Sequence, residues 1–176
     1  MKGTPQPESY SSHSGFRYAS DMPVKGHRER AYLLPGDLFV SIEPCQITTI
    51  LGSCVSICLW DKIRRVGGMN HFLLPTSRES GQTSSRFADV ATGALLEALR
   101  ASGCRTQNLA AKIFGGSAIL RTEKDYATSL GAKNVVAALR LMEQASIPVV
   151  EQETGGFQGR KIVFNTDDGV AWSRQV

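Results

Sequence analysis

Short apolar runs broken by Gly, Pro or Asp recur along this chain from "YLLPGDLFVSIEP" onward. Runs of this kind, rich in β-branched and aromatic residues and bounded by turn formers, are typical of β-strands. We expect strands at 38–42, 46–50, 55–60, 68–73, 109–114, 148–153, 161–164 and 170–173. A chain with so many short strands has to gather them into sheets and cover those sheets with other elements.

Two segments have helical spacing instead. In "SSRFADVATGALLEALRASG" the apolar residues recur at three- and four-residue intervals, and Gly103 closes the segment. In "GAKNVVAALRLMEQASIP" we expect Asn134 to be the N-cap, and Pro148 follows the helix end. Both apolar stripes are most simply core faces. The pattern therefore predicts an α/β fold, with two helices covering a mixed, largely antiparallel sheet.

The length of 176 residues, with 41% hydrophobic residues, suits one domain with a tail left over. Residues 1–30 are rich in Ser, Pro, Gly and charge, so we expect a flexible tail there and a single domain at 31–176. We find neither an apolar run that could span a membrane nor a secretory signal. The expected location is the cytoplasm, without membrane insertion.

The charge balance is mildly basic, with 20 Lys and Arg against 16 Asp and Glu and a net charge of +4. The positive residues are scattered and have no interleaved aromatic residues, which argues against nucleic-acid binding. A solvated surface accounts for this balance, and the alternative is an acidic protein partner or substrate.

The stretch "TTILGSCVSICLWD" carries two of the four cysteines, Cys54 and Cys58. On a strand these residues would lie roughly 13 Å apart, too far to share a metal ion or form a disulfide. Cys58 lies within the apolar run and is most simply a packing residue. Cys54 follows Gly52 and Ser53, where a tight turn allows a substrate carbonyl to approach and backbone N–H groups to hold an oxyanion. Cys54 is therefore the candidate nucleophile.

A nucleophilic cysteine needs a base, and His71 in "VGGMNHFLLP" is the one histidine inside the expected domain. If the strand after Cys54 pairs with the strand before His71 as a hairpin, their far ends meet and the two side chains lie close together. A core histidine remains the alternative interpretation. A third polar group is needed to orient the imidazole, and the candidates are Thr48, Thr49, Ser53 and Asn70.

At these residues the sequence resembles the CheD family of chemoreceptor glutamine deamidases. The matching pieces are "TILGSCVSICLWD", "VGGMNHFLLP", "RFADVATGALLEAL", "KIFGGSAIL", "GAKNVVAALRLMEQASIPVVEQETGG" and "GRKIVFNTDDG". Together they extend over roughly residues 35 to 170, nearly the whole expected domain.

The resemblance implies a layered α/β/β sandwich and a protein-glutamine deamidase that uses no cofactor and no metal. Its substrates would be glutamines of methyl-accepting chemotaxis receptors, and some members of the family also hydrolyse glutamyl methyl esters or bind a CheC-type phosphatase. The resemblance assigns Cys54 as nucleophile, His71 as general base and Thr48 as the residue that orients the histidine. Backbone N–H groups at Gly52 and Ser53 would hold the oxyanion.

Two other functions compete with deamidation. A non-catalytic adaptor would bind receptors or a CheC-type phosphatase and keep the domain as a scaffold. A different acyl-transfer enzyme, such as a cysteine protease or transglutaminase, is disfavoured by the resemblance. For recognition, the pairs Gly67–Gly68, Gly115–Gly116 and Gly155–Gly156 are expected to form the rims of a shallow site, the alternative being that they only make turns.

Overall fold

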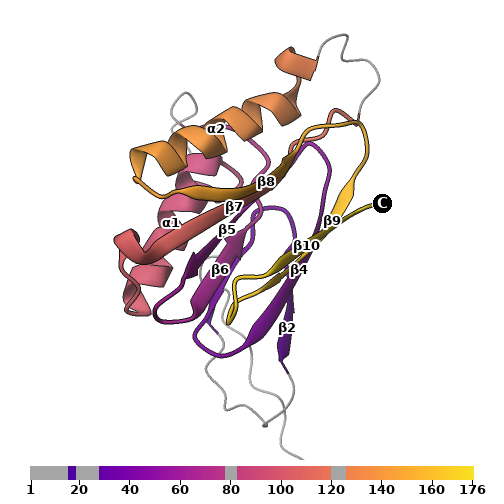
Figure 1. The fold of residues 1–176 in the computed structure, drawn as a ribbon. Helices are drawn as coiled ribbons and strands as arrows, with labels where there is room; N and C mark the ends of the chain where they lie inside the picture. Colours follow the sequence, from indigo (N-terminus) through magenta and orange to yellow (C-terminus); the bar gives the residue numbers. More distant parts are fainter. Residues whose placement is uncertain (1–15, 19–27, 78–82, 120–125) are drawn as a thin grey trace, which may run out of the picture.

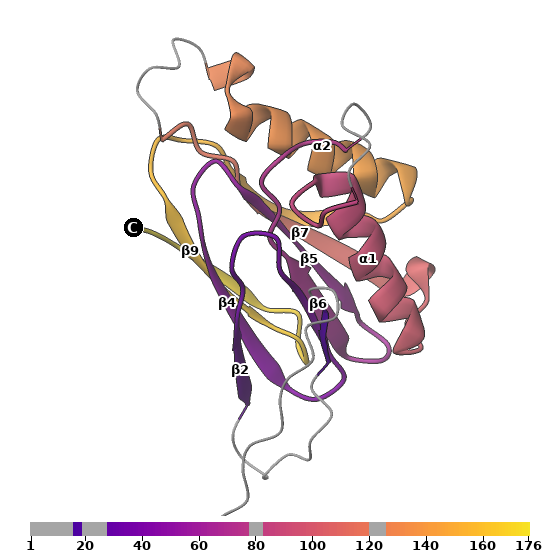
Figure 2. The same ribbon diagram turned by 180° about the vertical axis from the view of Figure 1, so that it is seen from behind.

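The computed structural model describes residues 16–18, 28–77, 83–119 and 126–176. Within these residues, two helices and ten strands form three layers (Figure 1). The helices cover one face of a six-stranded sheet, and a four-stranded sheet covers its other face (Figure 2). The α/β/β sandwich implied by the resemblance is confirmed.

The elements have the following bounds. The strands are β1 (Phe16–Tyr18), β2 (Glu29–Tyr32), β3 (Leu38–Ser41), β4 (Cys45–Leu51), β5 (Val55–Asp61), β6 (Val66–Asn70), β7 (Leu109–Gly115), β8 (Val149–Thr154), β9 (Arg160–Asn165) and β10 (Ala171–Gln175). The helices are α1 (Ala88–Ala101) and α2 (Leu130–Gln144), with short 3-10 turns at Thr106–Asn108 and Tyr126–Thr128.

The six-stranded sheet has the order β1-β3-β6-β5-β7-β8, and the four-stranded sheet has the order β10-β9-β4-β2. Neighbouring strands are antiparallel except for the pairs β1–β3, β7–β8 and β2–β4, which are parallel. The predicted mixed, largely antiparallel arrangement is confirmed, although it is divided between two sheets.

All eight predicted strands are present, each with slightly different ends. Two strands were missed, because β1 and the first half of β2 lie within residues 1–30, where we expected a tail. Residues 1–15 and 19–27 of that expected tail lie outside the described residues. Both helices are confirmed, but the N-cap of α2 is Ser129 and not Asn134. The Ser129 hydroxyl accepts a hydrogen bond from the Ala132 N–H at 3.1 Å.

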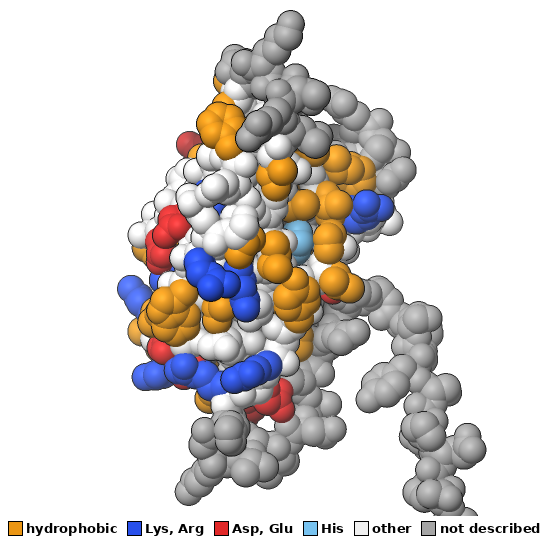
Figure 3. Space-filling view, turned by 90° about the vertical axis from the view of Figure 1, so that its right-hand side faces the viewer, with side chains coloured by type: hydrophobic (Ala, Val, Ile, Leu, Met, Phe, Trp, Pro, Cys, Tyr) orange, Lys and Arg blue, Asp and Glu red, His pale blue; other side chains and the backbone are white. Residues whose placement is uncertain are grey.

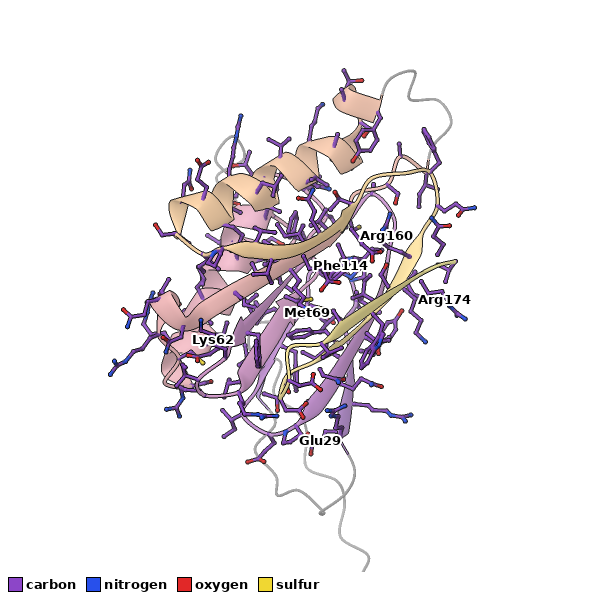
Figure 4. The ribbon with its side chains drawn as sticks, in the orientation of Figure 1. Glu29, Lys62, Met69, Phe114, Arg160 and Arg174 are labelled. Atoms are coloured by element: carbon purple, nitrogen blue, oxygen red, sulfur yellow. The ribbon has the colours of Figure 1, made fainter. Side chains whose placement is uncertain are left out.

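Two apolar cores separate the three layers. One lies between the helices and the six-stranded sheet and includes Leu95, Ile113 and Met142. The other lies between the two sheets, where Figure 4 shows Met69 and Phe114. Strand β5 contributes to both cores, because successive side chains on a strand point to opposite faces. Neither described helix is long and apolar enough to cross a membrane.

Candidate active site

Cys54 lies in the turn between β4 of the small sheet and β5 of the large sheet, and its side chain is half-buried. Three hydrogen bonds hold the carbonyl groups of this turn. Gly52 accepts from the Ser117 N–H at 2.8 Å and Cys54 from the Gly116 N–H at 2.8 Å. Ser53 accepts from the Asn134 side chain at 2.9 Å. Within the described part of the chain, the N–H groups of Gly52, Ser53 and Cys54 donate no hydrogen bond to another backbone carbonyl, so this turn can receive an oxyanion.

Burial raises the pKa of the Cys54 thiol above its ordinary value. Its own backbone N–H and the positive charge of Arg86 act in the opposite direction but are smaller effects. The thiol is therefore protonated at neutral pH, and attack by its sulfur requires a base that removes the proton.

His71 follows β6, and the predicted hairpin with β5 brings it to Cys54. The two strands pair antiparallel, and Val55 and Phe72 extend the pairing by exchanging backbone hydrogen bonds of 3.1 and 3.0 Å. In this register Cys54 and His71 are diagonal neighbours on the face toward the small sheet, the arrangement in which cross-strand side chains about 7–8 Å apart at their Cα atoms still meet. The hairpin prediction is confirmed.

The imidazole of His71 is held by Thr49, whose Oγ1 lies 2.9 Å from Nδ1. Thr49 uses its single hydroxyl proton to donate to the Leu33 carbonyl at 2.8 Å. It therefore has only lone pairs to offer to His71, so Nδ1 must carry the proton and donate it. The other nitrogen, Nε2, is left with its lone pair, and it is buried without a hydrogen-bond partner in the described part of the chain. This is the tautomer that a general base requires.

Burial lowers the pKa of His71 to about 4. The Leu33 carbonyl and the negative charge of Asp37 favour the protonated form but do not compensate for the burial. The loop that contains Leu33 and Asp37 also fixes the backbone, since His71 N–H donates to the Asp37 carbonyl at 2.9 Å and its own carbonyl accepts from Gly36 at 2.7 Å. At neutral pH the site pairs a neutral thiol with a neutral imidazole.

The assignment of Thr48 as the orienting residue is wrong by one position. In β4 the alternate residues Cys45, Ile47, Thr49 and Leu51 are buried between the sheets, whereas Thr48 points to the outer face. Side chains on a strand alternate between the two faces, so Thr48 and Thr49 cannot both reach His71. The hydroxyl on the imidazole belongs to Thr49.

Sequence reasoning also missed the role of Asn134, which is buried within α2. Its amide nitrogen donates to the carbonyls of Ser53 at 2.9 Å and Leu73 at 2.8 Å. Ser53 precedes Cys54, and Leu73 lies two residues after His71. One side chain thus connects the two segments that carry the thiol and the imidazole. A polar residue in an otherwise apolar helix stripe was the available signal.

We predict that Asn134→Asp lowers kcat roughly tenfold with little change in KM, because a displacement well under 1 Å between reacting groups already slows catalysis. The carboxylate has the shape of the amide but cannot donate to two carbonyl oxygens. Steady-state kinetics on protein verified as folded by circular dichroism would test this. Met142→Ala, a buried change elsewhere in α2, is the control. An equal loss of kcat in both variants would show that Asn134 only stabilises the fold and does not position the catalytic groups.

Two of the three glycine pairs do not form the expected rims, whereas Gly155 and Gly156 make a turn with φ angles of +80° and +79° in which Gly156 is exposed. Gly67 and Gly68 are buried within β6, and a Cβ at Gly68 would lie 2.6 Å from Val40 Cγ2. Gly115 and Gly116 have φ angles of +105° and +69° and pack beneath the Cys54 turn, where a Cβ on Gly115 would collide with the Cys54 carbonyl oxygen. Gly115 and Gly116 fit the alternative that the glycine pairs only make turns, because residues with a side chain rarely adopt such φ angles.

The other three cysteines are buried. Burial raises the pKa of Cys45 and of Cys104 to about 11, and that of Cys58 further still. None of them is a candidate nucleophile in the folded protein. Within the described ranges, no three His, Cys, Asp or Glu side chains gather in a way that could hold a metal ion.

We therefore expect iodoacetamide at neutral pH to label Cys54 first in the native protein, because it is the only described cysteine that is partly exposed and has a base beside it. The other three should react only on unfolding. Peptide mass mapping over a time course measures the four rates separately. Faster labelling of Cys45 or Cys104 than of Cys54 would contradict the assignment of the nucleophile.

Comparison with known proteins gives a consistent result. Residues 73–175 match the family model described as CheD chemotactic sensory transduction. The chain is 48% identical to the probable chemoreceptor glutamine deamidase CheD 1 of Anaeromyxobacter dehalogenans, over 90% of this chain and 91% of that protein. It is 43% identical to the probable chemoreceptor glutamine deamidase CheD of Trichlorobacter lovleyi, over 79% of this chain and 86% of that protein.

Proposed function

The chain belongs to the CheD family, and on this premise we propose that it is a protein-glutamine deamidase whose substrates are chemoreceptors. The observation that carries the proposal is a buried, neutral His71, held by Thr49, that is a diagonal cross-strand neighbour of the half-buried Cys54. Hydrolysis of an amide through a thioester needs a general base with a free lone pair and a thiol that can give up its proton to that base.

The reaction begins when Nε2 of His71 takes the thiol proton as Cys54 Sγ attacks the carboxamide carbon. The carbonyl oxygen becomes an oxyanion, which the N–H groups of the turn at Gly52, Ser53 and Cys54 hold, each such donor being worth about 3 kcal/mol where it has been measured. His71 then donates the proton to the departing nitrogen, and ammonia leaves a thioester on Cys54. Water, deprotonated by His71, cleaves the thioester to give glutamate and restores the thiol.

The same thioester would form from a glutamyl methyl ester, with methanol leaving in place of ammonia. Ester hydrolysis is therefore a second reaction that this site could perform without a further residue. A purely adaptor role is less well supported, because an adaptor has no need of an imidazole buried as a neutral base. Binding of a CheC-type phosphatase is compatible with the catalytic role and is part of the proposal only as an additional partner.

Incubation of the purified protein with a receptor signalling domain tests the function. Ammonia should be released, and mass spectrometry should find a gain of about one dalton per modified glutamine. The Cys54→Ser protein serves as the control for spontaneous deamidation. Unchanged glutamines after long incubation with a range of receptor domains would refute the proposal.

The pH dependence of kcat/KM should reflect the lowered pKa of His71. The free enzyme loses its base when His71 is protonated, and this occurs near pH 4 in the folded protein rather than near the ordinary value of about 6.5. Activity should therefore hold as the pH falls from 7 to 5 and decline only below that. Initial rates between pH 4 and 8 measure this, and a decline centred at 6.5 would mean that the imidazole is solvated in the active enzyme.

A further inference from the structure

The outer face of the four-stranded sheet lies on the same side of the molecule as the active site. Strand β4 carries Thr49 on its inner side and Thr48 and Ile50 on its outer side, and it leads directly into the turn with Cys54. In the space-filling view of Figure 3, hydrophobic side chains border a histidine, and basic side chains lie farther from it on the same face. A protein that presents a side chain to Cys54 would therefore pass over or next to this face.

Cross-strand register sorts the outward-facing side chains into three rows. The row nearest Cys54 consists of Ile50, Lys161 and Arg174; the next consists of Tyr32, Thr48, Val163 and Trp172; the last consists of Arg30 and Gln46, whose partner Asn165 is fully buried. We call the nine residues other than Asn165 the outer face. The first row and the last are each basic, and the row between them is apolar and aromatic.

The composition of the outer face is unusual for solvated surface. Tyr32 and Trp172 are 52% and 51% exposed although they are large aromatic side chains, the type enriched at protein interfaces. The outer face has three cations, Arg30, Lys161 and Arg174, and none of its nine residues is acidic. Within the described residues, none of these cations takes part in an ion pair.

From this arrangement we propose that the outer face is a docking surface for an acidic region of the substrate protein, next to the glutamine that enters the active site. The proposal rests on the proposed function for the identity of that substrate. Unpaired cations around an apolar row attract a surface of opposite charge and give it area to bury. The three rows extend about 13 Å along β4, from Ile50 to Gln46, so the substrate has to reach at least that far beyond its target residue.

Charge reversal provides the test. The double variant Lys161→Glu/Arg174→Glu changes the net charge by −4, and Lys62→Glu/Arg140→Glu changes it by the same amount on exposed residues away from the outer face. Figure 4 shows Lys62 and Arg174 on opposite sides of the molecule. Electrostatic attraction typically raises encounter rates tenfold or more. We expect the outer-face variant to lose about tenfold in kcat/KM on a receptor signalling domain at low salt, and the control variant to lose less than twofold.

Two further measurements separate this inference from the proposed function. Each double variant is also made in the Cys54→Ser background, and its affinity for the receptor domain is measured by titration calorimetry, which does not depend on turnover. Hydrolysis of a capped Gly-Gln-Gly peptide, too short to reach the outer face, should be equal in all proteins with Cys54. Equal losses in the two variants, unchanged receptor affinity, or a Cys54→Ser protein with an intact outer face that does not bind the domain would each overturn the docking surface.

Discussion

Removal of either Cys54 or His71 is expected to lower kcat by about 10³-fold or more, because general-base catalysis alone contributes about 10²–10⁴-fold and the nucleophile cannot act without it. Cys54→Ala removes the atom that forms the thioester, and His71→Ala removes the group that takes and returns the proton. Ammonia release from a receptor domain, measured over hours, gives the residual rates.

The double variant Cys54→Ala/His71→Ala is the sharper part of this prediction. When two residues act as one unit, the losses of activity caused by removing each of them are not additive. The double variant should therefore be no slower than the slower of the two single variants. Cys58→Ala is the control, since this thiol is buried on β5 and packs between the sheets. It should reduce stability while leaving kcat of the folded protein unchanged. Multiplicative losses in the double variant would show that the two residues act independently.

The pairing of Cys54 with His71 was predictable because it depends on local features of the sequence. Two apolar runs joined by a short charged turn predict a hairpin, and a hairpin brings together residues that lie just beyond its open end. The helices were predictable for a similar reason, since their apolar stripes repeat within one segment.

Features that depend on distant segments could not be derived in this way. Strand β2 is short, and it pairs with β4 in parallel across a connection of more than ten residues, so no local turn identifies it. The Leu33 carbonyl that fixes the tautomer of His71 is a backbone atom, and no side-chain type marks its position. The N-cap of α2 was misplaced because Ser129 and Asn134 are both good cap residues, and only the tertiary structure shows that Asn134 is needed elsewhere.

The error at Thr48 has a different origin. Two adjacent threonines have the same chemistry, and the resemblance alone did not separate them. The apolar residues Ile47 and Leu51 flank Thr49 at two-residue intervals, which is the spacing of one face of a strand. Applied to β4, this alternation would have placed Thr49 with the core-facing residues and Thr48 with the solvent-facing ones.

Replacement of these two threonines by valine, which is isosteric but lacks the hydroxyl, should therefore give opposite results. Thr49→Val takes away the acceptor of His71 Nδ1–H and the donor to the Leu33 carbonyl. The imidazole can then rotate or exchange its proton to Nε2, which abolishes its action as a base. An aspartate in the corresponding role of serine proteases is worth about 10⁴-fold, and for a neutral hydroxyl we expect a loss of about 10²-fold in kcat.

Thr48→Val is the matched control for the imidazole, because its side chain lies on the outer face and away from His71. As a member of the proposed docking surface it can change KM for the receptor, but kcat should stay within a factor of two. Thr49→Ser keeps the hydroxyl and should recover most of the activity, which a loss of packing alone would not explain. The two variants can also be compared by the rate at which iodoacetamide alkylates Cys54, because this rate needs the base but no receptor. A Thr48→Val enzyme slower than Thr49→Val in both assays would show that the active enzyme adopts the other register of β4.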